Sequence, residues 1–365
     1  MVIHEFKKVE LPKFRENANK SYGYYELGTD NKYYDYLMTL YKGSSNHSSM
    51  IDTQIQRIVG TGFQSDDPIE QEKIEKYKLN EWFNEVSRNL VMYGGFSTEI
   101  IWNELHTNIL EFYNINLDKI RIGMVDDEYD EPTLFYYSPN FSKYTYSNRN
   151  KNISLLYTFN DDPMTDNHQL LYNFGTNRLG DDKYPRPDYS PGIPWVETDV
   201  QIPIYYMNLI HNNFMVSNIL VVPYLPNSED RESFEKGIKE KFVGADNAAS
   251  TMVVYSPGGD SQEVKVINLA GDQGERKYDE LLIMTAESIA RAHRIPSPIL
   301  AGLTLPGNLF GISDLPTIEK MYNKSVIYPK RQQILNDFQK INNYLKTPLI
   351  DFNIGDLNSF DEKTT

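Results

Sequence analysis

The chain has 365 residues, of which 40% are hydrophobic and 13% aromatic, so it can bury a sizeable core and is not a disordered chain. It has no cysteine, which excludes disulfides, thiolate metal sites and cysteine nucleophiles. Its formal net charge is -15, the opposite of the clustered positive charge that a generic nucleic-acid-binding surface needs. Neither a signal peptide nor an apolar run of membrane-spanning length is predicted.

The N-terminal third is predicted to be mainly helical. Residues 1–30 are polar and tyrosine-rich with little periodicity, so we expect an N-terminal arm. Helices are predicted over 32–41 and 45–59, where apolar residues recur at helical spacing. A longer amphipathic pattern predicts one continuous helix over 69–92, with the glycine pair that follows it as the stop signal.

From Phe96 to Phe174 the pattern changes to short apolar runs separated by turn residues, which predicts strands. The predicted strands are 98–102, 110–115, 120–125, 134–137, 155–159 and 170–173. A proline-rich connection then leads to a helix predicted over 198–218. This helix is apolar on almost all sides, which implies burial on several sides, as for a helix packed between neighbouring subunits.

The next region, 219–272, has a strand–helix–strand–strand pattern (βαββ). Its helix is predicted to begin at Asn227 or Ser228, because both residues cap helices well. Glu229 and Asp230 follow in the first turn, where the helix dipole favours acids. This unit is short enough to be a compact module between two long helices.

The last part of the chain is predicted to be helical. A second long helix lies within 273–294, and a loop rich in proline, glycine and leucine follows over 295–312. The final helix, 313–345, contains Pro329 and is expected to kink there. Residues 346–365 are expected to form a C-terminal tail.

A search for catalytic chemistry finds no motif. The six histidines lack metal-ligand spacing, and His211 and His293, both on predicted helices, are interpreted as packing or hydrogen-bonding residues. The acid-rich run 126–131 lacks the glycine and terminal glutamate of a calcium loop and is interpreted as a hairpin tip. Neither a nucleophile elbow nor a phosphate-binding loop occurs. We therefore expect no enzyme activity, no metal and no cofactor, although the 51 acidic residues leave a carboxylate pair for glycoside hydrolysis open.

Four segments occur in an order that resembles the portal (head-to-tail connector) proteins of tailed bacteriophages. They are Tyr34-Asp35-Tyr36-Leu37 with Ser44-Ser45-Asn46-His47 and Ile58-Val59-Gly60-Thr61-Gly62; Tyr184-Pro185-Arg186-Pro187-Asp188-Tyr189 with Trp195; Phe242-Val243-Gly244-Ala245-Asp246-Asn247-Ala248-Ala249 with Met252-Val253-Val254-Tyr255; and Ile289-Ala290-Arg291-Ala292-His293-Arg294-Ile295-Pro296 through Gly302. Together they span roughly residues 30–345. The order of the segments carries the resemblance, because no single segment is diagnostic.

The resemblance implies an α+β portal-like fold. Its parts would be the wing (31–197), two stem helices (198–218 and 273–294), a βαββ clip (219–272), a tunnel-loop region (295–312) and a kinked wing helix (313–345). The helical crown of many portals would be short or absent, because the chain ends soon after Pro348.

The resemblance also implies a function. Portal subunits form a ring, typically a dodecamer, at one capsid vertex, and double-stranded DNA passes through it without sequence specificity during packaging and ejection. The implied partners are other copies of the chain, the terminase large subunit, the major capsid protein and the head-tail adaptor or neck proteins. The expected location is the virion, after assembly in the host cytoplasm, with no membrane involved.

Site residues follow from the same resemblance. The tunnel loop near DNA would contain Leu303, Thr304, Leu305, Pro306, Asn308 and Leu309. Arg276, Lys277, Arg291 and Arg294 would line the channel, and Glu229, Asp230, Glu232, Lys236 and Lys239 would form the clip surface that meets partners. An acidic chain suits a channel that must not hold phosphates tightly. The alternative interpretations are that the loop is ordinary core or interface and that the clip charges are a solvated helix face.

Two other classes of protein stay open. One is a different connector ring protein of the same virion, such as a head-tail adaptor, although adaptors are usually smaller. The other is a tyrosine-rich carbohydrate-active enzyme or binding module, which the 27 tyrosines and the many acids would suit. That class requires a strand-dominated C-terminal half, whereas the pattern over 278–345 is mainly helical.

Overall fold

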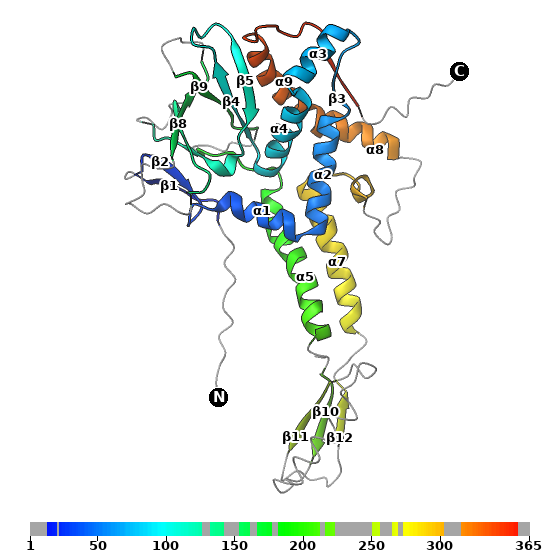
Figure 1. Ribbon diagram of the computed structural model, residues 1–365. Helices are drawn as coiled ribbons and strands as arrows, with labels where there is room; N and C mark the ends of the chain where they lie inside the picture. The colour runs from blue at the N-terminus through cyan, green and yellow to red at the C-terminus, as the bar shows by residue number, and fades with distance from the viewer. Residues whose placement is uncertain are drawn as a thin grey trace, which may run out of the picture. The chain divides into compact units, whose positions relative to one another are not determined.

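The computed structural model describes residues 13–19, 22–125, 132–141, 153–160, 166–176, 182–211, 216–222, 250–255, 265–268, 273–302 and 315–356. The chain forms two compact units. Unit 1 is Met1–Val196 with Glu287–Thr365, and unit 2 is Glu197–Ala286. Both contain helices and sheets, in agreement with the predicted α+β class (Figure 1). Within the described ranges, no helix combines the length and apolar character that a membrane crossing requires.

The N-terminal helices of unit 1 are α1 (Tyr33–Gly43), α2 (Ser45–Val59), α3 (Pro68–Lys76) and α4 (Leu79–Tyr93). Helix α2 begins where the predicted helix 45–59 begins, because the Ser44 side chain accepts a hydrogen bond from the His47 backbone N–H at 3.0 Å. The prediction of one helix over 69–92 is wrong. Lys78 adopts a left-handed conformation (φ 52°) and separates α3 from α4, although neither glycine nor proline marks the break.

The main sheet of unit 1 has six described strands in the order β5-β4-β9-β8-β7-β6. Their bounds are β4 (Phe96–Trp102), β5 (Ile109–Asn114), β6 (Ile120–Ile122), β7 (Leu134–Tyr137), β8 (Ser154–Thr158) and β9 (His168–Asn173). All neighbours are antiparallel except β8 and β9, which are parallel. These strands lie close to the predicted ranges, because short apolar runs separated by turn residues are a local signal of strands.

The core of unit 1 lies between this sheet and the helices α4 and α9 (Tyr328–Asn342). Trp82 of α4 donates a hydrogen bond to Thr98 of β4 (3.0 Å) and packs against Phe112 of β5. Phe338 of α9 is fully buried, with its ring 5.6 Å from Trp82 and 5.1 Å from Phe63. A two-stranded pair of β3 (Gly62–Gln64) and β13 (Asn353–Gly355) closes this end of the core.

The N-terminal segment differs from the predicted arm. Within residues 13–27, β1 (Glu16–Asn19) and β2 (Tyr24–Leu27) form an antiparallel hairpin, and Tyr24 and Leu27 are buried. The Glu16 carboxylate accepts hydrogen bonds from the backbone N–H groups of Lys183 and Tyr184, and its burial raises its pKa. The hairpin is therefore a packed part of unit 1, and residues 1–12 lie outside the description.

The predicted C-terminal helix is interrupted where Pro329 suggested a kink. Helix α8 (Leu315–Tyr322) passes into a π-helical turn (Asn323–Ile327), and α9 then begins at Tyr328. Pro329 lies in the first turn of α9, directly after the π-helical turn. The tail expected beyond residue 345 contains β13, which pairs with β3.

Unit 2 contains most of α5 (Ile193–His211), a three-stranded sheet and most of α7 (Gln273–Ala292). The sheet has the order β11-β10-β12, with β10 (Val216–Val222) parallel to β11 (Ser250–Tyr255) and antiparallel to β12 (Lys265–Asn268). Helix α5 begins at Ile193, five residues before the predicted helix 198–218. It also ends before the predicted end, because Val216–Asn218 belong to β10. The helix predicted after Asn227 lies outside the described residues.

Candidate functional site

Helices α5 and α7 expose apolar side chains within unit 2. On α5, Ile204 is 47% and Met207 56% exposed, and they share one face because they are three residues apart. On α7, Leu282 is 41% and Met284 48% exposed. Large apolar side chains that gather on exposed helices mark a surface that another chain covers. The exposed apolar residues of α5 are therefore a candidate surface for contact with another chain.

Most of the predicted channel and clip residues cannot be placed. The loop 303–309 and the clip charges Glu229, Asp230, Glu232, Lys236 and Lys239 lie outside the described residues. Arg276 and Lys277 lie in α7, but their side chains are outside the description. Arg291, in the last turn of α7, and Arg294, just beyond it, are exposed. Arg294 has a left-handed backbone (φ 59°), so the chain turns sharply as α7 ends.

The start of α5 and the end of α7 are tied together inside unit 1. Gly192 precedes α5 and lies so close to Ala292 that a Cβ at position 192 would collide with the Ala292 side chain. Tyr189 donates a hydrogen bond to the Met92 carbonyl at the end of α4 (2.6 Å), and its ring stacks on His293 at 4.9 Å. These contacts fix, within unit 1, the start of α5 and the end of α7.

A buried polar chain lies at the same place. Lys330 of α9 pairs with Asp188 (2.9 Å) and donates to the Gln54 side-chain oxygen of α2 (2.9 Å). The Gln54 amide nitrogen donates to the His293 carbonyl (2.9 Å), and His293 Nε2 lies 2.8 Å from His47 Nδ1. Four segments of unit 1 are joined by this chain.

The histidines of this chain are held neutral. Burial lowers the pKa of His47 to about 3, and burial followed by the charges of His47 and Lys330 lowers that of His293 well below its usual range. Burial also lowers the pKa of Lys330, against the opposing effect of Asp188. The expectation that His293 is a hydrogen-bonding residue is confirmed. Its partner His47 was missed because 246 residues separate the two in sequence.

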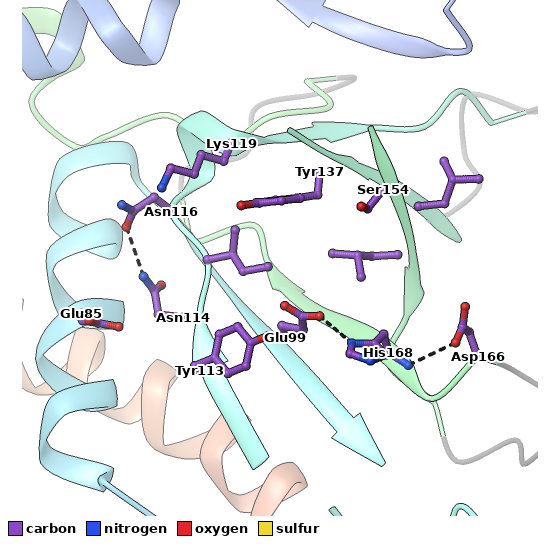
Figure 2. Close-up of a pocket in the computed structure, with 13 residues that line it drawn as sticks. Glu85, Glu99, Tyr113, Asn114, Asn116, Lys119, Tyr137, Ser154, Asp166 and His168 are labelled. Atoms are coloured by element: carbon purple, nitrogen blue, oxygen red, sulfur yellow. Dashed lines mark hydrogen bonds and ion pairs between the residues drawn. The ribbon is translucent and has the colours of Figure 1, made fainter. Parts of the chain in front are cut away.

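A polar pocket of about 620 Å³ lies on the six-stranded sheet (Figure 2). Glu99 of β4 accepts a hydrogen bond from His168 Nδ1 of β9 (2.8 Å). Burial and a hydrogen bond to Glu99 raise the pKa of Tyr113 to about 12. On α4, Glu85 also lines the pocket, and its pKa is raised by burial and by the charge of Glu81.

This pocket was not predicted, because its residues come from separate strands and a helix. Its lining is mainly polar. The Glu99 carboxylate already has two donors, His168 and Tyr113, and Ser154 is the one hydroxyl of serine or threonine in the lining. Among the described residues, that hydroxyl forms no hydrogen bond to a base. Within the same residues, no group of three or more His, Asp or Glu side chains is arranged to hold a metal ion.

Comparison with known proteins gives matches at the level of the fold. Neither a protein-family model nor a curated protein matches the chain. Among solved structures, a chain of the "Virion of native gene transfer agent (GTA) particle" aligns over 90% of this chain and 84% of its own length, with 13% identity and a TM-score of 0.61. A chain from the neck of the empty GTA particle, computed with C6 symmetry, aligns over 90% and 85% with 14% identity and a TM-score of 0.62.

A third match is a chain from the neck of the native GTA particle, computed with C12 symmetry. It covers 88% of this chain and 84% of its own, with 13% identity and a TM-score of 0.59. At these identities the likeness concerns the fold. The chain therefore shares its fold, over nearly all of its length, with chains of a phage-like particle and its neck.

Proposed function

We propose that the chain is a structural subunit of the head and neck of a phage-like particle, and specifically its portal protein. The observation that carries the proposal is the fold shared with virion and neck chains of GTA particles over about nine-tenths of the sequence. The order of sequence segments that resembles portal proteins supports it independently. In this assignment unit 1 is the wing, α5 and α7 are the stem helices, and the three-stranded sheet belongs to the clip.

The exposed helices of unit 2 support a ring. A ring is built from heterologous contacts, so each copy must cover two different surfaces of its neighbours. Ile204 and Met207 on α5, and Leu282 and Met284 on α7, supply apolar surfaces on two separate helices. A ring of twelve copies agrees with the C12 symmetry used for one of the matching neck structures.

DNA passage without binding agrees with the charges of the chain. The net charge of -15 disfavours tight phosphate contacts, while the exposed Arg291 and Arg294 would give the channel a few cations that attract DNA transiently. The loop from Leu303 to Leu309 would lie nearest the DNA. The proposed partners are the terminase large subunit, the major capsid protein and head-tail adaptor or neck proteins, all in the virion.

Of the alternatives, the carbohydrate-active class is disfavoured by the structure of the C-terminal half. It needs a strand-dominated C-terminal half, whereas α7, α8 and α9 make up most of the described residues from 273 to 345. The sheet pocket, with Tyr113 and Tyr137, is the feature that would favour it. A head-tail adaptor is disfavoured by the length of the chain.

The test is the mass and shape of the purified chain. Light scattering should give a mass near twelve times 42.4 kDa, and negative-stain images should show closed rings with a central hole. A chain that stays monomeric at high concentration and binds oligosaccharides would contradict the proposal.

A further inference from the structure

The hydrogen bonds around Gln54 determine its amide orientation. The Lys330 ammonium can only donate, so the Gln54 atom it contacts at 2.9 Å is the oxygen. The His293 backbone carbonyl can only accept, so the atom facing it at 2.9 Å is the amide nitrogen. Both neighbours demand the same orientation. The nitrogen of Gln54 therefore also faces His293 Nδ1, at 3.4 Å.

This orientation selects one tautomer for each histidine. Because His293 Nδ1 faces an NH₂ group, it must carry a lone pair, and its hydrogen lies on Nε2. His293 Nε2–H then donates to His47 Nδ1 across 2.8 Å. The hydrogen of His47 is consequently on its own Nε2, a buried atom without a hydrogen-bond partner among the described residues.

An additional proton has no position that preserves these contacts. On His293 Nδ1 it would place a donor against the Gln54 NH₂ group. On His47 Nδ1 it would place two N–H groups against each other across 2.8 Å. Tyr189, whose ring packs against both imidazoles, is neutral. The charged group that acts on the pair is Lys330, with Arg294 and Asp188 acting on Lys330 in turn. Two of these three groups are cations, and the one carboxylate already pairs with Lys330 at 2.9 Å.

We propose that His47, Gln54, Asp188, His293 and Lys330 form a proton-sensitive joint, named here the histidine joint, that holds the C-terminal end of α7 against α2 and α9 and releases it when the histidine pair takes up a proton. The release is local. The hydrogen bonds that would be lost are those from the His293 ring and the His293 backbone carbonyl to α2. The joint is a property of unit 1 and does not depend on ring formation.

The segment after His293 is the part that the histidine joint controls. Its described residues run to Gly302. Ile295 and Ala301 are buried, and Ser49 Oγ donates a hydrogen bond to the Ala301 carbonyl (2.6 Å). If the portal proposal is correct, the released segment is the one that leads into the proposed tunnel loop 303–309. Proton uptake would then alter how firmly that loop is anchored at the channel.

The test is hydrogen–deuterium exchange of peptides covering 286–302, corrected for the intrinsic effect of pH, on the full chain at pH 7.5 and pH 5.0. Corrected exchange in the wild type should be about tenfold faster at pH 5.0. His47→Gln keeps an acceptor for His293 Nε2–H and removes one of the two titrating histidines, so acidification to pH 5.0 should accelerate its exchange clearly less than that of the wild type. His168→Gln, the same substitution at a half-exposed histidine of the sheet, should behave like the wild type.

A second variant tests the sign of the effect. Gln54→Glu places a carboxylate against His293 Nδ1 and favours the added proton, but it also removes the amide donor to the His293 carbonyl. The predicted effect is therefore on the pH response: the ratio of its exchange at pH 5.0 to that at pH 7.5 should be smaller than in the wild type. Equal protection of the wild type at both pH values would overturn the joint. So would a pH response in His47→Gln, or in Gln54→Glu, as large as that of the wild type. These outcomes are read from one chain, so they are distinct from a failure to form rings.

Discussion

Units 1 and 2 differ in whether their described large apolar side chains form a closed core. In unit 1, the side chains of Trp82, Phe63 and Phe338 meet in one core and are almost completely removed from solvent. In unit 2, side chains of similar size on α5 and α7, among them Met207 and Leu282, are 40% exposed or more. Unit 1 has a closed apolar core beside exposed apolar residues such as Leu105, whereas none of the large apolar side chains described in unit 2 is fully buried.

This difference leads us to expect that unit 1 determines the stability of the single chain and that unit 2 determines its assembly. Burial of apolar surface contributes roughly 25 cal/mol per Å², so unit 1 gains its stability from its own fold. The exposed side chains of unit 2 can make that contribution only when another chain covers them. Substitutions in unit 1 should therefore alter the stability of the single chain, and substitutions on the exposed helices should alter assembly.

The largest expected effect on stability is at the core of unit 1. Phe338→Ala removes a fully buried ring that packs against Trp82, Phe63 and Phe352, and should lower the free energy of unfolding by about 3–5 kcal/mol. Urea unfolding followed by tryptophan fluorescence measures the change. Leu105→Ala, at a side chain that is 75% exposed, is the matched control and should change stability by less than about 0.5 kcal/mol. Similar losses in both variants would break the contrast between buried and exposed apolar residues.

A smaller effect is expected from acid. The pKa of His47 is lowered to about 3 and that of His293 is also lowered, while both would titrate near 6.5 in the unfolded chain. Between these values the unfolded chain binds more protons, so the stability contribution is complete above about pH 6.5 and is lost as the pH falls. At pH 5 the loss is about 2 kcal/mol at most for each histidine.

Urea midpoints of the wild type and of His47→Gln at pH 7.5 and 5.0 check this effect. The variant should lose less stability on acidification than the wild type does. His168→Gln, where the histidine is half exposed and paired with Glu99, should reproduce the wild-type difference. If His47→Gln lost as much stability on acidification as the wild type, the histidine pair would not be the cause of the acid sensitivity.

The smallest effect is expected at the start of α2. Ser44→Ala removes the side-chain acceptor for the His47 backbone N–H and should cost about 1 kcal/mol. Ser48→Ala, which removes a hydroxyl within the same helix that bonds only to the Ser45 carbonyl, is the control. Thermal unfolding should separate the two variants by a few degrees. Equal stability of both variants would mean that the Ser44 cap does not stabilise the start of α2.

Local patterns predicted much of unit 1. Helix α2 has the predicted bounds, and the six strands of the main sheet fall close to the predicted ranges, because helical periodicity and short apolar runs between turn residues are local properties. The break between α3 and α4 was missed, since Lys78 is an ordinary residue in an unusual backbone conformation. The hairpin of β1 and β2 was missed as well, because it depends on packing against distant residues such as Lys183.

The candidate sites show the limit of such reasoning. An all-round apolar first helix predicted a partner, and exposed apolar residues are indeed present on α5. The His47–His293 contact joins residues 246 positions apart, and the sheet pocket collects residues from several strands. No local pattern predicts such proximities, since they arise only when separate elements pack together. The end of the first helix was placed too late, because Val216–Asn218 suit both a helix and a strand.

The most direct test of the account is the assembly of variants on the exposed face of α5. The double variant Ile204→Glu/Met207→Glu should leave the unfolding free energy of the single chain within about 0.5 kcal/mol of the wild type. It should also abolish rings in light scattering and negative-stain images. The control variant Leu105→Glu, on the exposed surface of unit 1, should assemble as the wild type does. Intact rings from the α5 variant, or monomers from the Leu105 variant alone, would contradict the claim that the long helices of unit 2 carry the assembly surface.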